Sequence, residues 1–191
     1  MDDEFEEVPP AKSTGLGFSS WMGAIFVGAT FALIANLFFI NIYNIPSESM
    51  DPTLRVKDYI ISVPLLDNRE DPERGDVVLF YPPESWDKPE GEVFIKRAIA
   101  IGGDTVECCS PEGEVLVNGE PIEEEYRQGG NGDLTYSFTV PEDSIFVLGD
   151  NREHSADSRY HPYEPFIPLD RVIGQPISII YPFNHIKLLN N

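Results

Sequence analysis

The chain has 191 residues, of which 41% are hydrophobic, so the sequence can supply a folded core and global disorder is not expected. Its formal net charge is −20, from 33 acidic and 13 basic residues. No basic block could follow a phosphate backbone, which argues against nucleic-acid binding. The acidic excess would also repel anionic lipid headgroups, apart from any apolar surface that enters a membrane.

A long apolar stretch near the N-terminus predicts a membrane anchor. The stretch runs from Trp21 to Tyr43 without a charged residue. As a helix rising ~1.5 Å per residue it would cover about 35 Å, enough to cross a hydrocarbon core of ~30 Å. A cleaved secretory signal peptide is the alternative, but its apolar region spans only about 7–15 residues after a basic start, and this start is acidic. We expect a tail over 1–18 and a transmembrane helix over 19–43, with an orientation that the nearby charges do not decide.

Residues 44–191 predict a mainly β domain, because their hydrophobic runs are short, rich in β-formers and separated by turn signals. Strands are expected over 58–63, 76–81, 92–101, 105–109, 114–117, 134–140, 144–148 and 172–181. This spacing suggests antiparallel sheets folded into a barrel or sandwich-like domain. Residues 104–141 contain an Asn-Gly hairpin signal and a Gly-rich loop, and we expect them to form a small inserted β subdomain.

Three polar segments could carry chemistry. They are IPSESMDPTL (45–54), FIKR (94–97) and GDNREHSADSR (149–159). A serine hydroxyl is a weak nucleophile until a base removes its proton, and a lysine can be that base if burial lowers its pKa. Each segment also has an ordinary reading, since turn-rich polar runs satisfy their own backbones and a strand lysine can cover apolar surface with its stem.

Strand alternation makes Lys96 the strongest candidate base. Side chains alternate between the two faces of a strand, so Lys96 shares a face with Phe94, Ala98 and Ala100. The isoleucines at 95, 99 and 101 would point the other way, together with Arg97. A lysine among alanines and a phenylalanine would be desolvated.

Metal and disulfide signals are weak. A site built from Asp150, His154, Asp157 and His161 fits no ligand spacing, and neither zinc nor a disulfide framework follows from the adjacent Cys108 and Cys109. The sequence leaves open whether these two cysteines are oxidised. We expect no metal and no cofactor.

Taken together after one apolar stretch, the three segments resemble bacterial type I signal peptidases. The resemblance rests on Ser-x-Ser-Met-x-Pro-Thr-Leu, on the strand ending in Ile-Lys-Arg, on the Gly-Asp that follows it, and on Gly-Asp-Asn-Arg-x-x-Ser-x-Asp-Ser-Arg. It runs from about Trp21 to the end and is closest to the smaller members found in Gram-positive bacteria. Each motif alone is short, but the joint pattern is specific.

The resemblance implies a role for each matching residue. Ser49 would be the nucleophile and Lys96 the general base, which later returns its proton to the leaving amine. The backbone N–H of Ser49 and the hydroxyl of Ser47 would hold the oxyanion, and Ser155 would hydrogen-bond and orient Lys96. Two ion pairs would support these groups, namely Asp157 with Arg159 and Asp150 with Arg97.

The resemblance also implies the substrate and the location. Family members cut secretory preproteins after small residues, typically Ala-x-Ala, and the substrate would add a strand beside 45–47 and 92–95. Shallow pockets for it would be lined by Ile45, Pro46, Met50, Leu54 and Ile95. The partners would be preproteins and the lipid bilayer, close to the secretion translocon, with residues 44–191 outside the cytoplasm.

Glu48 departs from the expected pattern because it puts a carboxylate beside the nucleophile. Neighbours in an extended segment face opposite ways, so we expect Glu48 to face solvent. Two other functions stay open: a dedicated processing peptidase with the same dyad, and a membrane-tethered β-rich binding module without activity. The dyad geometry also resembles that of self-cleaving repressors of the SOS response, which lack an anchor.

Overall fold

The computed structural model describes residues 18–38, 41–63 and 71–189, and the chain divides into two compact units, Met1–Phe38 and Phe39–Asn191. The first unit contains helix α1 (Phe18–Phe38). Within the described residues, no helix combines the length and the apolar character that crossing a membrane requires. The expected tail over 1–18 lies outside the described residues, apart from Phe18.

The end of the expected helix over 19–43 is wrong. The helix stops at Phe38, and residues 41–43 belong to strand β1 (Asn41–Asn44). There the chain pairs antiparallel with β2 (Tyr59–Val63), and Tyr43 lies opposite Ile60. An apolar run that ends in Ile-Asn-Ile-Tyr can serve either element, and the neighbouring strand decides between them.

The second unit is mainly β and antiparallel, which confirms the expected class. Its further strands are β3 (Val77–Phe80), β4 (Phe94–Ile101), β5 (Thr105–Cys108), β6 (Val115–Val117), β7 (Glu120–Pro121), β8 (Tyr136–Thr139), β9 (Ser144–Leu148), β10 (Phe166–Pro168), β11 (Val172–Tyr181) and β12 (Lys187–Leu188). Its short 3-10 helices are η1 (Glu84–Trp86), η2 (Arg152–His154), η3 (Ser158–Tyr160), η4 (Leu169–Arg171) and η5 (Phe183–His185).

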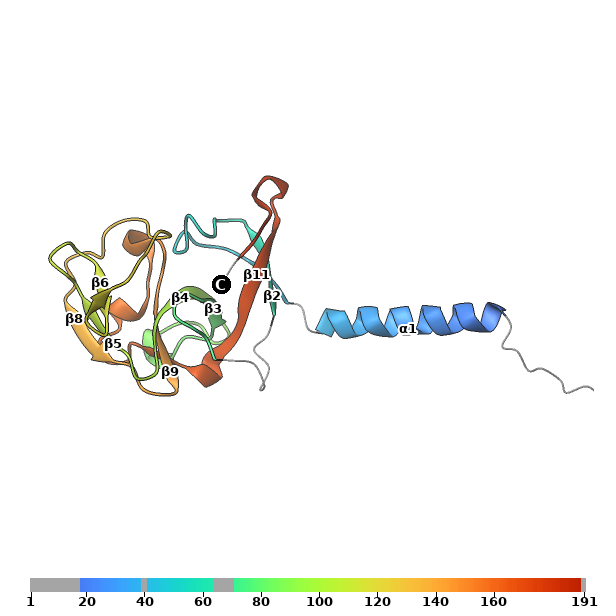
Figure 1. Ribbon diagram of the computed structural model, residues 1–191, viewed down its shortest axis with the longest axis horizontal. Helices are drawn as coiled ribbons and strands as arrows, with labels where there is room; N and C mark the ends of the chain where they lie inside the picture. The colour runs from blue at the N-terminus through green and yellow to red at the C-terminus, as the bar shows by residue number, and fades with distance from the viewer. Residues whose placement is uncertain (1–17, 39–40, 64–70, 190–191) are drawn as a thin grey trace, which may run out of the picture. The chain divides into compact units, whose positions relative to one another are not determined.

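The strands form two sheets in the described part of the chain (Figure 1). The larger sheet has the order β1-β2-β11-β3-β4-β9-β10, and β12 pairs with β11. The smaller sheet has the order β7-β6-β5-β8 and lies within the segment 104–141 that the sequence predicts as a subdomain. Strand β4 therefore runs between β3 and β9, inside the larger sheet.

Three buried clusters surround β4 and decide which way its side chains point. The first lies between the small sheet and strands β4 and β9, and contains Ile99, Ala100, Val106, Val115, Phe146 and Leu148. The second contains Ile45, Met50, Leu54, Ile60, Val77, Leu79, Ile95 and Ile179. The third contains Val78, Phe80, Trp86, Ala98, Ile145, Val147, Ile167 and Val172.

The expected alternation along β4 holds only in part. Phe94 packs on the third cluster with Ala98, but Ala100 packs in the first cluster together with Ile99. The register against β9 shifts between Ala98 and Ala100, and such a bulge breaks the two-residue period.

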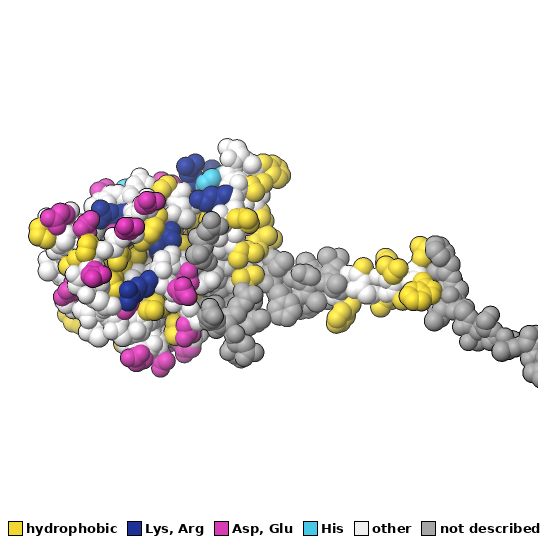
Figure 2. Space-filling view, viewed as in Figure 1, with side chains coloured by type: hydrophobic (Ala, Val, Ile, Leu, Met, Phe, Trp, Pro, Cys, Tyr) yellow, Lys and Arg dark blue, Asp and Glu magenta, His cyan; other side chains and the backbone are white. Residues whose placement is uncertain are grey.

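The surface is unevenly charged. Figure 2 shows acidic side chains spread over the β-rich unit and apolar side chains gathered along its β11 side. The exposed apolar side chains on β2, β11, η5 and β12 are Tyr59, Ile177, Tyr181, Phe183 and Leu188. Strands β1, β2, β11 and β12 contain no Asp or Glu.

Candidate active site

The segment that follows β1 carries Ser49 into the domain. The Ile45 N–H donates to the carbonyl of Asp58 at 2.8 Å, and the Leu54 N–H donates to the carbonyl of Met50 at 2.8 Å. The side chains of Ile45, Met50 and Leu54 are buried in the second cluster. Three apolar residues thus anchor a polar segment, and Ser49 between them is only 4% exposed.

Strand β4 brings Lys96 against Ser49. The Lys96 Nζ lies 2.8 Å from the Ser49 Oγ and 3.0 Å from the carbonyl oxygen of Ile95. It also lies 5.4 Å from the centre of the Phe94 ring. Lys96 is 4% exposed, so the contact between amine and hydroxyl is shielded from water.

Burial changes the acid–base behaviour of this amine. Desolvation lowers the pKa of Lys96 from 10.5 to about 8. The carboxylates of Asp157 and Asp150 oppose this change because they favour the charged amine, and the ammonium of Lys88 reinforces it. A neutral amine is therefore accessible near neutral pH, as a general base requires.

The two residues before Ser49 face solvent. Ser47 is exposed, and its Oγ lies 3.3 Å from the Ser49 Oγ. Glu48 is exposed, as expected, but the expected reason is wrong, because residues 47–53 form bends and turns and the Asp51 N–H donates to the Glu48 carbonyl at 3.0 Å. The hydroxyl of Ser47 can therefore reach an atom bound at Ser49, while the Glu48 carboxylate stays in water.

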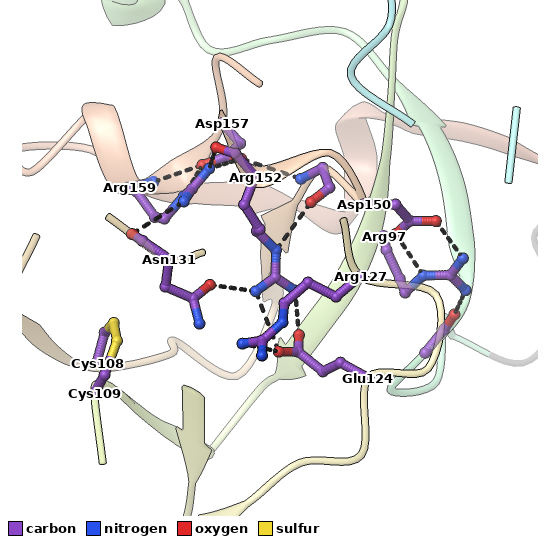
Figure 3. Close-up of polar contacts among 12 residues, drawn as sticks. Arg97, Cys108, Cys109, Glu124, Arg127, Asn131, Asp150, Arg152, Asp157 and Arg159 are labelled. Carbon is purple, nitrogen blue, oxygen red and sulfur yellow. Dashed lines mark hydrogen bonds and ion pairs between the residues drawn. A yellow bond between two sulfur atoms is a disulfide. The ribbon is translucent and has the colours of Figure 1, made fainter. Parts of the chain in front are cut away.

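The third polar segment, residues 149–159, is hydrogen-bonded to the backbone of Ser49 and to Arg97, the residue after Lys96. The Asn151 N–H donates to the carbonyl of Ser49 at 3.1 Å. Asp150 is fully buried and accepts two hydrogen bonds from Arg97, at 2.9 and 2.7 Å (Figure 3). Thr53 donates a further hydrogen bond to Asp150 at 2.5 Å. One loop therefore holds the backbone of Ser49 and the neighbour of Lys96.

A second buried ion pair stiffens the same loop. The Arg159 guanidinium donates to both oxygens of Asp157, at 2.8 and 2.9 Å. Asp157 also accepts the Gly149 N–H at 3.0 Å. The Asp157 carboxylate therefore closes the loop onto its own first residue.

Ser155 does not make the expected hydrogen bond to Lys96. It is 5% exposed, and its hydroxyl finds no hydrogen-bond partner among the described residues. The amine of Lys96 instead contacts Ser49 and the carbonyl of Ile95. Ser155 does lie beside Gly149 and close to the Ser49 backbone, because a side chain at position 149 would collide with the Ser155 hydroxyl and with the Ser49 carbonyl oxygen.

The residues expected to line substrate pockets fall into two groups. Ile45, Met50, Leu54 and Ile95 share the second cluster and are buried around Ser49, and Pro46 is exposed.

Cys108 and Cys109 are joined by a disulfide at the end of β5 (Figure 3). Among the residues described, no three His, Cys, Asp or Glu side chains are grouped so as to hold a metal ion.

Sequence reasoning missed three residues around the loop. Arg152 is 1% exposed and pairs with Glu124, and the ring of Tyr126 lies 3.9 Å from the guanidinium carbon of Arg97. Arg152 stands inside the third motif, so its position there was a usable signal. Glu124 gave none, because a run of three glutamates is typical of a solvated surface.

Comparison with known proteins shows which family has this sequence pattern. Residues 18–181 match the protein family described as "Signal peptidase, peptidase S26". By class the chain is a serine peptidase, a hydrolase that cleaves peptide bonds. It belongs to the signal peptidase family, peptidase S26, which confirms the resemblance seen in the motifs.

Individual relatives agree with this assignment. Signal peptidase I of Leptolyngbya laminosa is 39% identical over 145 residues, which cover 74% of this chain and 69% of the relative. A probable signal peptidase I of Mycobacterium leprae is 31% identical, covering 91% of this chain and 78% of the relative. The crystal structure of a signal peptidase I from Enterococcus faecalis is 32% identical, covers 56% of this chain and 97% of its own, and gives a TM-score of 0.43.

Proposed function

We propose that the chain is a membrane-bound endopeptidase that removes N-terminal signal peptides from secreted preproteins, with Ser49 as nucleophile and Lys96 as general base. The observation that carries the proposal is the buried 2.8 Å contact between the Lys96 Nζ and the Ser49 Oγ. The pKa of Lys96, lowered by burial to about 8, supports the role of base. Membership of the signal peptidase family supports the reaction class.

The chemistry follows from these two groups. Neutral Lys96 accepts the Ser49 proton as the Ser49 Oγ attacks the scissile carbonyl carbon. The resulting oxyanion accepts hydrogen bonds from the Ser49 N–H and the Ser47 hydroxyl. Lys96 then gives its proton to the departing amine, which leaves an ester on Ser49. Water, deprotonated by Lys96, attacks the ester, and Lys96 returns this proton to the departing Ser49 Oγ, which frees the serine and the signal peptide's carboxylate.

The substrate of the proposal is an extended segment with alanine or another small residue before the cut. The apolar side chains beside the serine, Ile45 and Ile95, are themselves 2% and 8% exposed. Depressions left above such tightly buried side chains would be shallow, and they would accept alanine and reject bulky residues. The substrate backbone would pair with 45–47 and 92–95.

The location in the proposal is the membrane, with residues 44–191 on the extracytoplasmic side. The uncharged stretch over 21–43 supports attachment. The acid-free strands with their exposed Tyr59 and Tyr181 support contact with the interfacial region of a bilayer, where tyrosine is enriched. Carbonate extraction of membranes from cells expressing the full chain tests attachment. Release of the chain into the supernatant would contradict it.

Cleavage of a purified preprotein in detergent tests the reaction. The wild type is expected to cut after the second alanine of an Ala-x-Ala site, and Ser49→Ala and Lys96→Ala are each expected to lose at least about 10³-fold in rate. A preprotein with leucine in place of that alanine is the control for specificity. Circular dichroism shows whether each variant is folded.

The outcomes separate the alternatives. Cleavage that persists in folded Ser49→Ala would overturn the assignment of the nucleophile. Failure of the folded wild type to cut any Ala-x-Ala preprotein would favour a specialised processing peptidase. Retention of all cellular function by Ser49→Ala would favour a binding module.

A further inference from the structure

Residues 124–128, which we call the strap, lie between strands β7 and β8 of the small sheet. The strap contacts the loop 149–152, which is hydrogen-bonded to Ser49 and Arg97. The Gln128 N–H donates to the carbonyl of Asp150 at 2.8 Å, and the Arg152 N–H donates to the carbonyl of Gln128 at 2.9 Å. Gln128 and Asn151 thereby form an isolated parallel bridge. The strap is thus hydrogen-bonded to the residues on either side of Asn151, whose N–H holds the Ser49 carbonyl.

The first residue of the strap makes a buried ion pair with the same loop. Glu124 pairs with Arg152, and their side chains are 4% and 0% exposed (Figure 3). The Arg152 Nε donates to the carbonyl of Gly149 at 3.0 Å, and its Nη1 donates to Asn131. A guanidinium buried this deeply has to keep its partners, because removing one leaves an uncompensated charge.

The middle residue of the strap covers the other arginine of the site. The centre of the Tyr126 ring lies 3.9 Å from the guanidinium carbon of Arg97. Arg97 follows Lys96 in the chain and is hydrogen-bonded to Asp150. Alternate residues of the strap, Glu124 and Tyr126, thus contact the two arginines on either side of the loop. Glu125 between them is exposed, and so is Glu123, which precedes the strap.

We propose that Glu124 and Arg152 are positioning residues, which clamp the loop 149–152 and thereby keep Ser49 and Lys96 at reacting distance. The inference rests on the proposed function of that pair. The clamp reaches Ser49 through the 3.1 Å hydrogen bond from Asn151 and reaches Lys96 through Asp150 and Arg97. In the described part of the chain, the side-chain hydrogen bonds and ion pairs of Glu124 and Arg152 go to Gly149, Arg127, Asn131 and each other, and none goes to the segments 45–47 and 92–95 that would bind substrate, so we expect the loss of the clamp to act on the chemical step.

Glu124→Gln tests the clamp, with Glu123→Gln as the matched control that removes an exposed charge one residue away. A displacement of about 1 Å at a reacting centre costs up to ~10²-fold, so we expect kcat of folded Glu124→Gln to fall at least about tenfold while KM stays within about twofold. Glu123→Gln should match the wild type in both constants. Tyr126→Leu should lower kcat in the same way.

A second readout does not depend on cleavage. Hydrogen–deuterium exchange should speed up in residues 149–152 of Glu124→Gln and not in the neighbouring strand β9, because the strap no longer holds the loop. Equal exchange and equal kcat in folded Glu124→Gln would overturn the clamp, and so would a rise in KM alone. If Glu124→Gln does not fold, Glu124→Asp, which keeps the charge but shortens its reach towards Arg152, decides by the same two measurements. A wild type that cuts no preprotein would refute the proposed function, while the exchange result would still decide the clamp.

Discussion

Exchange of Lys96 for Met should stabilise the folded chain near neutral pH while it abolishes cleavage. Burial lowers the pKa of Lys96 from 10.5 to about 8, so the folded state disfavours the ammonium that the unfolded chain carries. Each tenfold change in an equilibrium constant corresponds to about 1.4 kcal/mol, so the charged lysine costs about 3 kcal/mol below pH 7. Methionine has a similar volume and no charge to desolvate.

The sign of the pH dependence follows from proton binding. Between pH 8 and 10.5 the unfolded state holds a proton on Lys96 that the folded state has released, so the free energy of unfolding of the wild type gains from this group as pH rises. Above 10.5 both states are neutral and the cost is gone. The stability advantage of Lys96→Met over the wild type should therefore shrink by about 2–3 kcal/mol between pH 7 and pH 10.

Urea unfolding in detergent, followed by the fluorescence of the buried Trp86, measures both proteins at the two pH values. Other titrating groups cancel in the difference between the two proteins. Lys187→Met is the control, because that lysine is exposed on β12. A difference between wild type and Lys96→Met that is the same at pH 7 and pH 10 would refute the lowered pKa and, with it, the reason for choosing lysine as base.

Three further outcomes are expected. The rate of cleavage should rise about tenfold per pH unit below pH 8 and level off above it as Lys96 loses its proton, and a bell centred below pH 7 would contradict the role of an amine base. Gly149→Ala should lose at least about 100-fold in kcat, because its Cβ would lie 2.5 Å from the Ser49 carbonyl oxygen, whereas Gly130→Ala meets nothing closer than 4.0 Å and should be tolerated. Glu48→Ala should change kcat less than tenfold because the side chain is exposed, and a larger loss would mean that its carboxylate acts on the site.

Local pattern predicts most of the fold. All eight expected strands have counterparts, because alternation and turn residues are local signals that the sheets then satisfy. Strands β7, β10 and β12 were missed, since each has only two or three residues and exists because a partner strand offers hydrogen bonds. Strand β1 was taken for helix because apolar content alone cannot tell a span from a strand that pairs with β2.

The candidate site shows a different division. The motifs identify Ser49 and Lys96, which are 47 residues apart in the chain, but only the fold sets their distance and burial. Alternation correctly puts Phe94 beside Lys96 and fails after Ala98, where a bulge that no local residue signals changes the register. Glu124 is invisible to sequence reasoning because its buried partner is 28 residues away.

The electrostatics of the site explain why Asp150 and Asp157 are each paired with an arginine. Asp150 and Asp157 raise the pKa of Lys96, so an unpaired carboxylate at either position would favour the ammonium and weaken the base. Each instead accepts two hydrogen bonds from a guanidinium, Asp150 from Arg97 and Asp157 from Arg159, and the positive charge of the arginine opposes that of the carboxylate at the amine. The two buried ion pairs thereby fix the loop, while desolvation remains the largest contribution to the pKa of Lys96. Lys96 can remain a base in a chain of net charge −20 because desolvation of its amine outweighs the attraction of these two carboxylates.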